Sequence, residues 1–243
     1  YMYDSYGDGI VPPGGYDVKD ASGAIIASNT PNWSFLADHY FETTGNNPGF
    51  VSTVPENKNV ILEHFNGGIQ NYFASDGDLT AQTLANNNPS DFFIITIHEG
   101  GFATPNFGEP DFQTSWGAAI QNQAYVTGYP AGSINRHQFS MTQNGGTAMS
   151  RGDWSAANTQ LLAQSSPVNV GVQADIDIAT NVLTVDVEVY YTGSQTITSN
   201  MLNIAVLQHN ILGPQTGGSV YNPSAIDPVT GLYIHQDMLR HMM

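Results

Sequence analysis

The chain has 243 residues, enough for one large domain or two to three small ones, and its 40% hydrophobic content suffices for ordinary cores. Charge is its unusual feature, because 21 acidic residues face only five basic ones and give a formal net charge of −16. This balance argues against nucleic acid and against anionic membrane surfaces as partners, since both require clustered Lys and Arg. It favours bound cations or a salty medium, and it equally fits a role in solubility alone.

Cysteine is absent, which excludes disulfides, thiolate metal sites and thiol redox chemistry. The sequence contains no apolar run long enough to cross a bilayer and no basic, apolar leader. The last residues, 240–243, follow a helix-like pattern without a cap. We therefore expect this chain to be a fragment or a processed piece.

Residues 1–56 are predicted to form a small N-terminal β-module and a linker. Tyr16 and Val18 alternate with polar neighbours, 20–23 has turn composition, and 24–27 returns, which predicts a hairpin. The aromatic residues of this region, among them Tyr3, Tyr6 and Trp33, are candidate contacts for a ligand.

Asp4 and Asp8 are the candidate metal ligands of this region. They lie four residues apart, with glycines at positions 7 and 9, and Ca²⁺ prefers carboxylate and carbonyl oxygens from such loops. Asp17 or Asp20 would complete the shell. The full EF-hand spacing is missing, however, and Asp-Gly is also ordinary turn chemistry, so both interpretations stay open.

Residues 57–166 are predicted to form an α/β domain, because apolar runs with strand character alternate with helical periodicity. The run 91–97 is continuously apolar, which predicts a parallel strand covered on both faces. Ser150, followed three residues later by Asp153, predicts a capping box for the last helix. The expected elements are strand 60–65, helix 75–84, strand 91–97, helix 110–125, a strand within 128–136 and helix 149–165.

The loop between the first strand and the first helix is the candidate functional position of this domain, since sites in such folds gather where a strand ends and a helix begins. Here it carries Gln70, Asn71, Tyr72 and Phe73, with no thiol and no nucleophile. We weigh two interpretations: a ligand groove or partner surface, and a fold retained as scaffold, which we favour.

Residues 167–243 change to a period of two. Apolar residues alternate along 168–178 and again along 183–189, and a tight turn at 180–181 would place Ile178 opposite Leu183. The same register would place Asp175 opposite Asp186 on the outer face, where a cation or salt would screen them. With a third strand at 203–207, the pattern predicts an immunoglobulin-like antiparallel β-sandwich that is cut short.

Three segments, read in order, resemble a known family. They are EHFNGGIQNYF at 63–73, GYPAGSINR at 128–136 and YIHQDMLR at 233–240. Together they resemble the thioredoxin-like domain of the twenty-eight-kilodalton-class outer-membrane-protein (Omp) family of Bacteroidetes lipoproteins. The segment from Asp4 resembles the D-S-Y-G-D-G β-module of secreted Bacteroidetes proteins, with Ile10 where that pattern has Trp.

The resemblance implies a thioredoxin-like fold whose two active-site cysteines are replaced by Gln70 and Phe73, and whose following proline is replaced by Ala74. It also implies that Pro130 is the cis-proline beside that loop. Because Gln70 cannot ionise and Phe73 can only pack, redox catalysis is excluded on chemical grounds.

Our first hypothesis is a non-enzymatic protein of the cell surface or outer membrane. It would bind or assemble with other protein chains in a surface complex or polymer, and calcium is its candidate cofactor. One alternative is an extracellular protein that binds carbohydrate or another ligand. A second is a degenerate oxidoreductase, which we rank last because no acid, base or nucleophile replaces the lost thiols.

Overall fold

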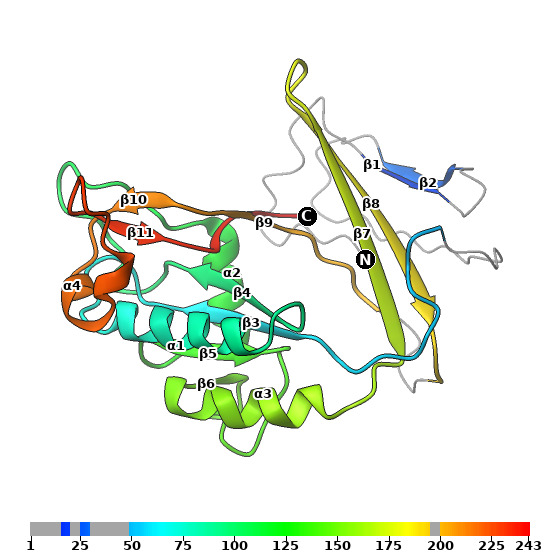
Figure 1. Ribbon diagram of the computed structural model, residues 1–243, viewed down its shortest axis with the longest axis horizontal. Coiled ribbons are helices and arrows are strands. Elements are labelled where there is room, and N and C mark those ends of the chain that lie inside the picture. The colour runs from blue at the N-terminus through cyan, green and yellow to red at the C-terminus, as the bar shows by residue number, and fades with distance from the viewer. Residues whose placement is uncertain (1–15, 20–24, 30–48, 195–199) are drawn as a thin grey trace. The chain divides into compact units, whose positions relative to one another are not determined.

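The computed structural model describes residues 16–19, 25–29, 49–194 and 200–243 (Figure 1). Contacts divide the chain into two units, the first made of 1–58 and 163–202 and the second of 59–162 and 203–243. The fold is mixed α/β, with one six-stranded sheet and three two-stranded sheets. None of the helices in these residues is long and apolar enough to cross a membrane.

The first unit contains two antiparallel hairpins. Its strands are β1 (Tyr16–Lys19), β2 (Ile25–Asn29), β7 (Val168–Asp177) and β8 (Val182–Tyr191). In the first hairpin Val18 lies opposite Ala27, so the hairpin predicted for this region is confirmed.

The register of the second hairpin differs from the prediction by two residues. Ile176 lies opposite Leu183, whereas the expected tight turn would have placed Ile178 there. The last pair is Asp177 with Val182, so the turn is two residues longer than predicted, and within it the Asp177 side chain accepts a hydrogen bond from the Ala179 N–H at 2.8 Å. A shift of two keeps the apolar residues on one face. It removes the predicted charge pair, because Asp175 faces Thr184 and Asp186 faces Gln173.

The polar face of this hairpin is covered near its base by 49–54. The Glu188 carboxylate accepts hydrogen bonds from the backbone N–H groups of Phe50, Val51 and Gly49 at 2.6, 2.9 and 2.9 Å. The bond from Phe50, followed by those from Val51 and Gly49, lowers the pKa of Glu188. The Asn169 side chain donates to the carbonyls of Ser52 and Val54. Three backbone donors therefore stabilise the charged form of Glu188 on the acidic face of the hairpin.

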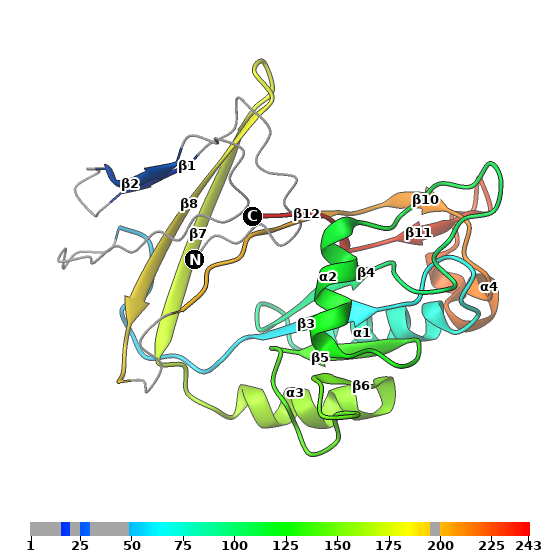
Figure 2. The same ribbon diagram turned by 180° about the vertical axis from the view of Figure 1, so that it is seen from behind.

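The second unit is built on the six-stranded sheet, whose strand order is β6-β5-β3-β4-β12-β9 (Figures 1 and 2). The central strand β3 is parallel to β4 and antiparallel to β5, and β5 is antiparallel to β6. On the other side of β4, strand β12 is parallel to β4 and antiparallel to β9. The sheet strands are β3 (Val60–Phe65), β4 (Phe92–Ile97), β5 (Ala131–Ile134), β6 (Ala148–Ser150), β9 (Ala205–Gln208) and β12 (Met238–Met242).

Helices and a short hairpin complete this unit. The helices are α1 (Ala74–Asn87), α2 (Ser115–Ala124), α3 (Trp154–Leu162) and the short α4 (Gly218–Tyr221), with 3-10 turns η1 (Arg151–Asp153) and η2 (Pro223–Ala225). The hairpin pairs β10 (Ile211–Gly213) with β11 (Tyr233–His235).

The core lies on both faces of the sheet. One cluster joins Val60 and Leu62 of β3 to α1 and to Trp154 of α3, while a second joins Phe65 of β3 to α2. Figure 2 shows α2 on the side of the sheet opposite α1. The run 91–97 was expected to be covered on both faces, but Phe93 is 48% exposed because α2 covers only the carboxyl-terminal half of the strand.

The predicted strands and helices of this unit are present, with two corrections. The helix predicted for 110–125 begins only at Ser115, where the Thr114 side chain accepts a hydrogen bond from the Gly117 N–H at 2.9 Å. The capping box expected at Ser150 and Asp153 is absent, because Ser150 makes no side-chain cap and 151–153 form a 3-10 turn before α3.

Residues 167–243 were predicted to form a domain of their own, but residues 203–243 belong to the α/β unit. In the described residues β7 and β8 pair only with each other, while β9, expected to join them in a sandwich, pairs with β12 in the six-stranded sheet. The interpretation of 240–243 as helix-like is also wrong, because Met238–Met242 form a strand. Its pairing with both β4 and β9 overrides the local helical pattern.

Candidate functional site

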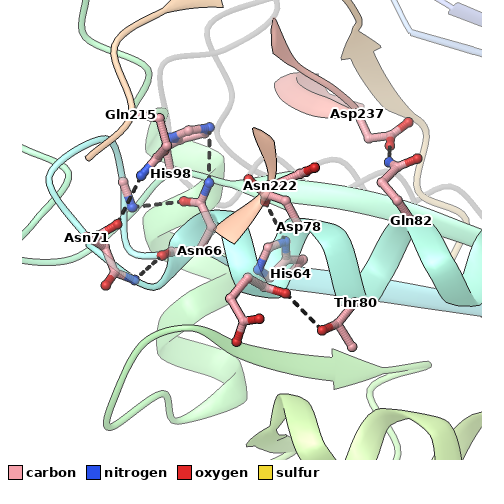
Figure 3. A network of polar contacts seen from close by, with 12 residues as sticks. His64, Asn66, Asn71, Asp78, Thr80, Gln82, His98, Gln215, Asn222 and Asp237 are labelled. Carbon is pink, nitrogen blue, oxygen red and sulfur yellow. Dashed lines mark hydrogen bonds and ion pairs between the residues drawn. The ribbon is translucent and has the colours of Figure 1, made fainter. Parts of the chain in front are cut away.

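The loop 66–73 connects β3 to α1 and is held first by its own side chains (Figure 3). The Asn66 side chain accepts a hydrogen bond from the Gly68 N–H at 2.8 Å, and its Nδ2 lies 3.3 Å from Nε2 of His98. The Asn71 side chain donates to the Asn66 carbonyl and accepts from the Phe73 N–H. Two buried amides therefore fix the path of the chain into the helix.

Two segments distant in sequence also hold this loop. The Gln215 side chain donates to the Asn71 carbonyl at 3.0 Å, and the Thr216 N–H donates to the Ile69 carbonyl at 2.9 Å. On the other side, the Gln70 N–H donates to the Phe102 carbonyl at 3.0 Å. The loop is thus a preorganised part of the fold.

Gly67 and Gly68 make these close contacts possible. Both have positive φ, of 83° and 90°. A Cβ on Gly67 would lie 2.6 Å from Cβ of Tyr129, and one on Gly68 would overlap the backbone of Ala103. Only glycine combines this backbone conformation with so close an approach.

Gln70 and Phe73, the positions of the lost cysteines in the resemblance, serve different roles. The Gln70 side chain donates a hydrogen bond to the Glu109 carboxylate at 2.7 Å. Phe73 is the residue before α1 and remains 44% exposed. Neither side chain carries a nucleophile, and the two lie in different surroundings.

An aromatic cluster, made of Tyr72, Phe73 and Tyr221, forms at the start of α1. The Tyr221 ring centroid lies 5.3 Å from that of Tyr72 and 5.4 Å from that of Phe73. The guanidinium of Arg151 lies 5.9 Å from the Phe73 ring centroid, and its Nε binds the Asp76 carboxylate at 2.5 Å. Tyr72 and Phe73 are 45% and 44% exposed, so the cluster presents aromatic surface to solvent.

Pro130 lies beside this loop, and its peptide bond with Tyr129 is cis, the isomer that the sequence analysis predicted. A Cβ added to Gly77 would lie 2.9 Å from Cβ of Pro130, so the proline packs against the first turns of α1. Tyr129 packs over Gly67, and its hydroxyl donates to the Gln121 side chain at 2.6 Å.

A cavity of about 290 Å³ lies on the α1 face of the sheet, within the second unit. Its walls come from α1, the strands β3, β4 and β11, and the segment around η2. Residues of polar character dominate the lining, among them His64, Asp78, Gln82, Thr96, Asn222 and Tyr233. Thr83, Asn86 and Ser224 also line it and are exposed, so the cavity is open to solvent.

A buried acid and a buried histidine meet at this cavity (Figure 3). The Tyr233 hydroxyl donates to Oδ2 of Asp78 at 2.9 Å and accepts from Asn222 Nδ2 at 3.1 Å. Nδ1 of His64 lies 3.3 Å from Oδ1 of Asp78 without forming a hydrogen bond. Burial raises the pKa of Asp78 to about 7 and lowers that of His64 to about 3, so His64 is neutral at physiological pH.

The carboxyl of Asp237 adds to the negative potential near this cavity. It accepts a hydrogen bond from the Gln82 side chain at 2.8 Å and lies 3.3 Å from Nδ1 of His209. Burial raises the pKa of Asp237, against the hydrogen bond from Gln82 and the attraction of His209. Asp237 in turn contributes to the raised pKa of Asp78.

The remaining predicted site residues are placed as follows. Asp4 and Asp8, the candidate calcium ligands, lie outside the described residues, as do Tyr3, Tyr6 and Trp33. In the described ranges no group of three or more His, Asp or Glu side chains is arranged to hold a metal ion. The calcium site stays a prediction.

The cavity residues were not identified from the sequence, although one signal was available. Asp78 falls in the same helical stripe as the buried residues Ala74 and Ala81, at a spacing of four and three. An acidic residue in the core-facing stripe of a helix marks a buried carboxyl that needs a partner. Its partners, Tyr233 and Asn222, lie more than 140 residues away in sequence and carry no such signal.

Comparisons with protein-family models, with curated proteins and with solved structures found no match to this chain. The function is therefore inferred from the geometry of the loop, the aromatic cluster and the cavity.

Substitution of Gly68 by Ala is predicted to destabilise the second unit by at least about 2 kcal/mol, because it combines a strained backbone with a steric clash against Ala103. Urea denaturation measures the effect. Gly108→Ala is the control for the backbone alone, since φ is +86° there and no atom lies within 4 Å; it should cost about 1 kcal/mol. Gly101→Ala, which has neither feature, should be neutral. Equal losses at 68 and 108 would contradict the contact with Ala103.

Substitution of Asp78 by Asn is predicted to change how stability depends on pH. Because the folded pKa is raised from 3.8 to about 7, stability from this carboxyl is greatest below the unfolded pKa and falls as pH rises to about 7. Asp78→Asn lacks this loss, so its stability relative to wild type should increase between pH 4 and pH 7, by on the order of 3 kcal/mol at most.

Denaturation at a series of pH values measures this difference. The lowered pKa of His64 makes stability rise with pH over roughly the same window, but this contribution is common to both proteins and cancels. Asp91→Asn, at an exposed position just before β4, is the matched control and should follow wild type at every pH. Parallel curves for Asp78→Asn and wild type would show that the carboxyl is not perturbed.

Proposed function

We propose that this protein is a non-enzymatic binding and assembly protein of the cell surface or outer membrane, built on a redox-dead thioredoxin-like domain. The aromatic cluster is its contact face, and other protein chains are its partners. The observation that carries the proposal is the exposed cluster at the loop after β3, the position where the resemblance places a redox pair.

The strand order supports the thioredoxin-like assignment. β3, α1 and β4 form a parallel βαβ unit, α2 leads to the antiparallel pair β5 and β6, and α3 follows. The order β4-β3-β5-β6, with these directions, agrees with the thioredoxin-like arrangement that the resemblance implies, and β12 and β9 extend the sheet beyond β4. Pro130 stands directly before β5, beside the loop, as the resemblance implies.

The composition of the cluster supports a protein partner. Tyr, Phe and Arg are enriched in protein interfaces, where aromatic residues near the centre supply most of the binding energy. Here Tyr72 and Phe73 are exposed, and Arg151 lies over the Phe73 ring. The hydrogen-bonded loop beneath them fixes their positions in the free protein, which lowers the entropic cost of binding.

The alternatives remain open predictions. The contact residues named for carbohydrate binding, Tyr3, Tyr6 and Trp33, lie outside the described residues. In the cluster the Tyr72 and Tyr221 rings meet at 86°, whereas a flat aromatic platform would suit a sugar ring better. The degenerate oxidoreductase ranks last, because Gln70 and Phe73 supply no thiol.

Self-association tests the proposal. We expect the protein to sediment as a species heavier than its 26.1 kDa monomer. Tyr72→Ser combined with Phe73→Ser should weaken this association about tenfold or more, since truncating an interface aromatic costs about 2 kcal/mol. Tyr125→Asn is the control, because Tyr125 is 57% exposed and its φ of 59° suits Asn. Sedimentation velocity measures the change. A monomer at every concentration, or equal losses in both variants, would contradict the proposal.

Calcium at Asp4 and Asp8 is tested in the same assay. If calcium links the chains, EDTA should return the assemblies to monomers, and Asp4→Asn combined with Asp8→Asn should reproduce that effect in excess calcium. Assemblies that are unchanged by EDTA would leave the aromatic contact in place and remove the role of calcium.

A further inference from the structure

The cavity beside α1 is lined by an acidic side chain that faces no basic side chain of the lining other than the neutral His64. Asp78 lines it, and none of the lining residues is Lys or Arg. The nearby Asp237 adds a second acidic group, shared with the exposed His209. Buried carboxylates in proteins are ordinarily paired, because an isolated buried charge costs several kcal/mol. The charge of this cavity therefore matches a positively charged occupant.

Two side chains at the cavity, His64 and Asp78, also have polar atoms without hydrogen-bond partners in the described part of the chain. His64 is fully buried, and neither of its ring nitrogens makes a hydrogen bond. Oδ1 of Asp78, unlike Oδ2, receives no hydrogen bond and lies 3.3 Å from Nδ1 of His64. A neutral imidazole has one N–H, and the tautomer with the proton on Nδ1 directs it toward Oδ1 of Asp78. The Asp78 side chain keeps 15% of its surface exposed whereas His64 keeps none, so the Asp78 carboxylate is the acceptor that an occupant of the cavity can reach.

We propose that this cavity binds a small organic cation through its ammonium group, with Asp78 as the counter-ion and hydrogen-bond acceptor. An ammonium carries three donors, and the lining supplies further oxygens from Thr96 and Asn222. This site is separate from the aromatic cluster, and the proposal does not depend on the protein's role in assembly.

Size and charge narrow the ligand class. A volume of about 290 Å³ lies at the lower end of the range for ligand pockets, so it fits a compact amine or the end of a lysine side chain. An anion would be repelled by Asp78 and Asp237. A bare metal ion is disfavoured, because the described residues contain no group of three ligands arranged around one point.

The affinity should depend on pH in a defined direction. The groups that face Asp78 are His64 from β3 and Tyr233 from β11, together with Asp237 and, through it, His209. Burial keeps His64 neutral and raises the pKa of Tyr233, so Asp78 is the group that titrates near neutrality. An alkylammonium stays charged to about pH 10. Binding should therefore strengthen as pH rises from 5 to 8, by up to about a hundredfold.

Titration of the whole chain with n-butylammonium, followed by two-dimensional NMR, tests the proposal. We expect saturable shifts at the Asn222 and Gln82 side-chain amides and at the Thr96 backbone. Asp78→Asn should weaken binding at least about tenfold, because it removes a charged acceptor and keeps the shape of the side chain. Asp91→Asn is the matched control and should bind as wild type does.

Neutral and anionic probes of similar size complete the experiment. Equal binding of 1-butanol or butyrate, no saturable shift with butylammonium, or an unchanged affinity in folded Asp78→Asn would each overturn the proposal. A parallel titration with Nα-acetyl-lysine methylamide distinguishes the source of the ammonium. If it binds as well as butylammonium, the site accepts a lysine side chain of a protein; if only butylammonium binds, the site takes free amines.

Discussion

The loop after β3 packs closely against the segments that carry Tyr129 and Ala103. The rest of the second unit depends on this constraint. Gly67 and Gly68 have no Cβ, so Tyr129 and Ala103 can pack directly against the backbone. That contact brings Pro130 against α1 and leaves Asn66 and Asn71 to fix the start of the helix. The exposed positions of Tyr72 and Phe73 follow from this path, because the inward side of the loop is already filled by backbone and amide groups.

A second constraint acts one residue beyond the Gly77 contact with Pro130, where α1 carries the carboxyl of Asp78 to the buried His64. Replacing a buried ionisable group with an apolar one is often neutral or stabilising. Asp78 and His64 both lose hydration on folding, and their pKa values move in opposite directions toward the neutral forms. A buried pair that lowers the stability of the fold is better explained by a ligand than by packing, and the proposed ammonium group would supply the missing charge.

The sequence predicted those features that local patterns determine. Strands such as Val60–Phe65 and the helix after them followed from periodicity and from the break at Gly67, and the faces of β7 and β8 followed from alternation. A shift of two residues preserves that alternation, so the pattern could not distinguish the predicted register from the observed one. The observed register has a longer turn, which the hydrogen bond from the Ala179 N–H to the Asp177 side chain stabilises.

Features that depend on contacts between residues far apart in the chain could not be predicted from local sequence patterns. The strand at Met238–Met242 has a helix-like pattern, and only its pairing with β4 and β9 makes it a strand. For the same reason the predicted sandwich failed, since nothing local in 203–207 indicates which sheet that strand joins. Gln70 and Phe73 lie between β3 and α1, as predicted, but the residues that complete the cluster and the cavity, Tyr221 and Tyr233, come from the far end of the chain.

Both sites of the second unit share two structural elements. Phe73 precedes α1 and Asp78 lies on it, five residues or about 7.5 Å further along the axis. Tyr221 packs against Phe73, and the next residue, Asn222, donates to the hydroxyl that binds Asp78. Because these two residues are consecutive, a displacement of α4 that altered the aromatic cluster would also alter the hydrogen bonds at the cavity. The short helix α4 therefore gives the two sites a common support, although they face different surroundings and suit different ligands.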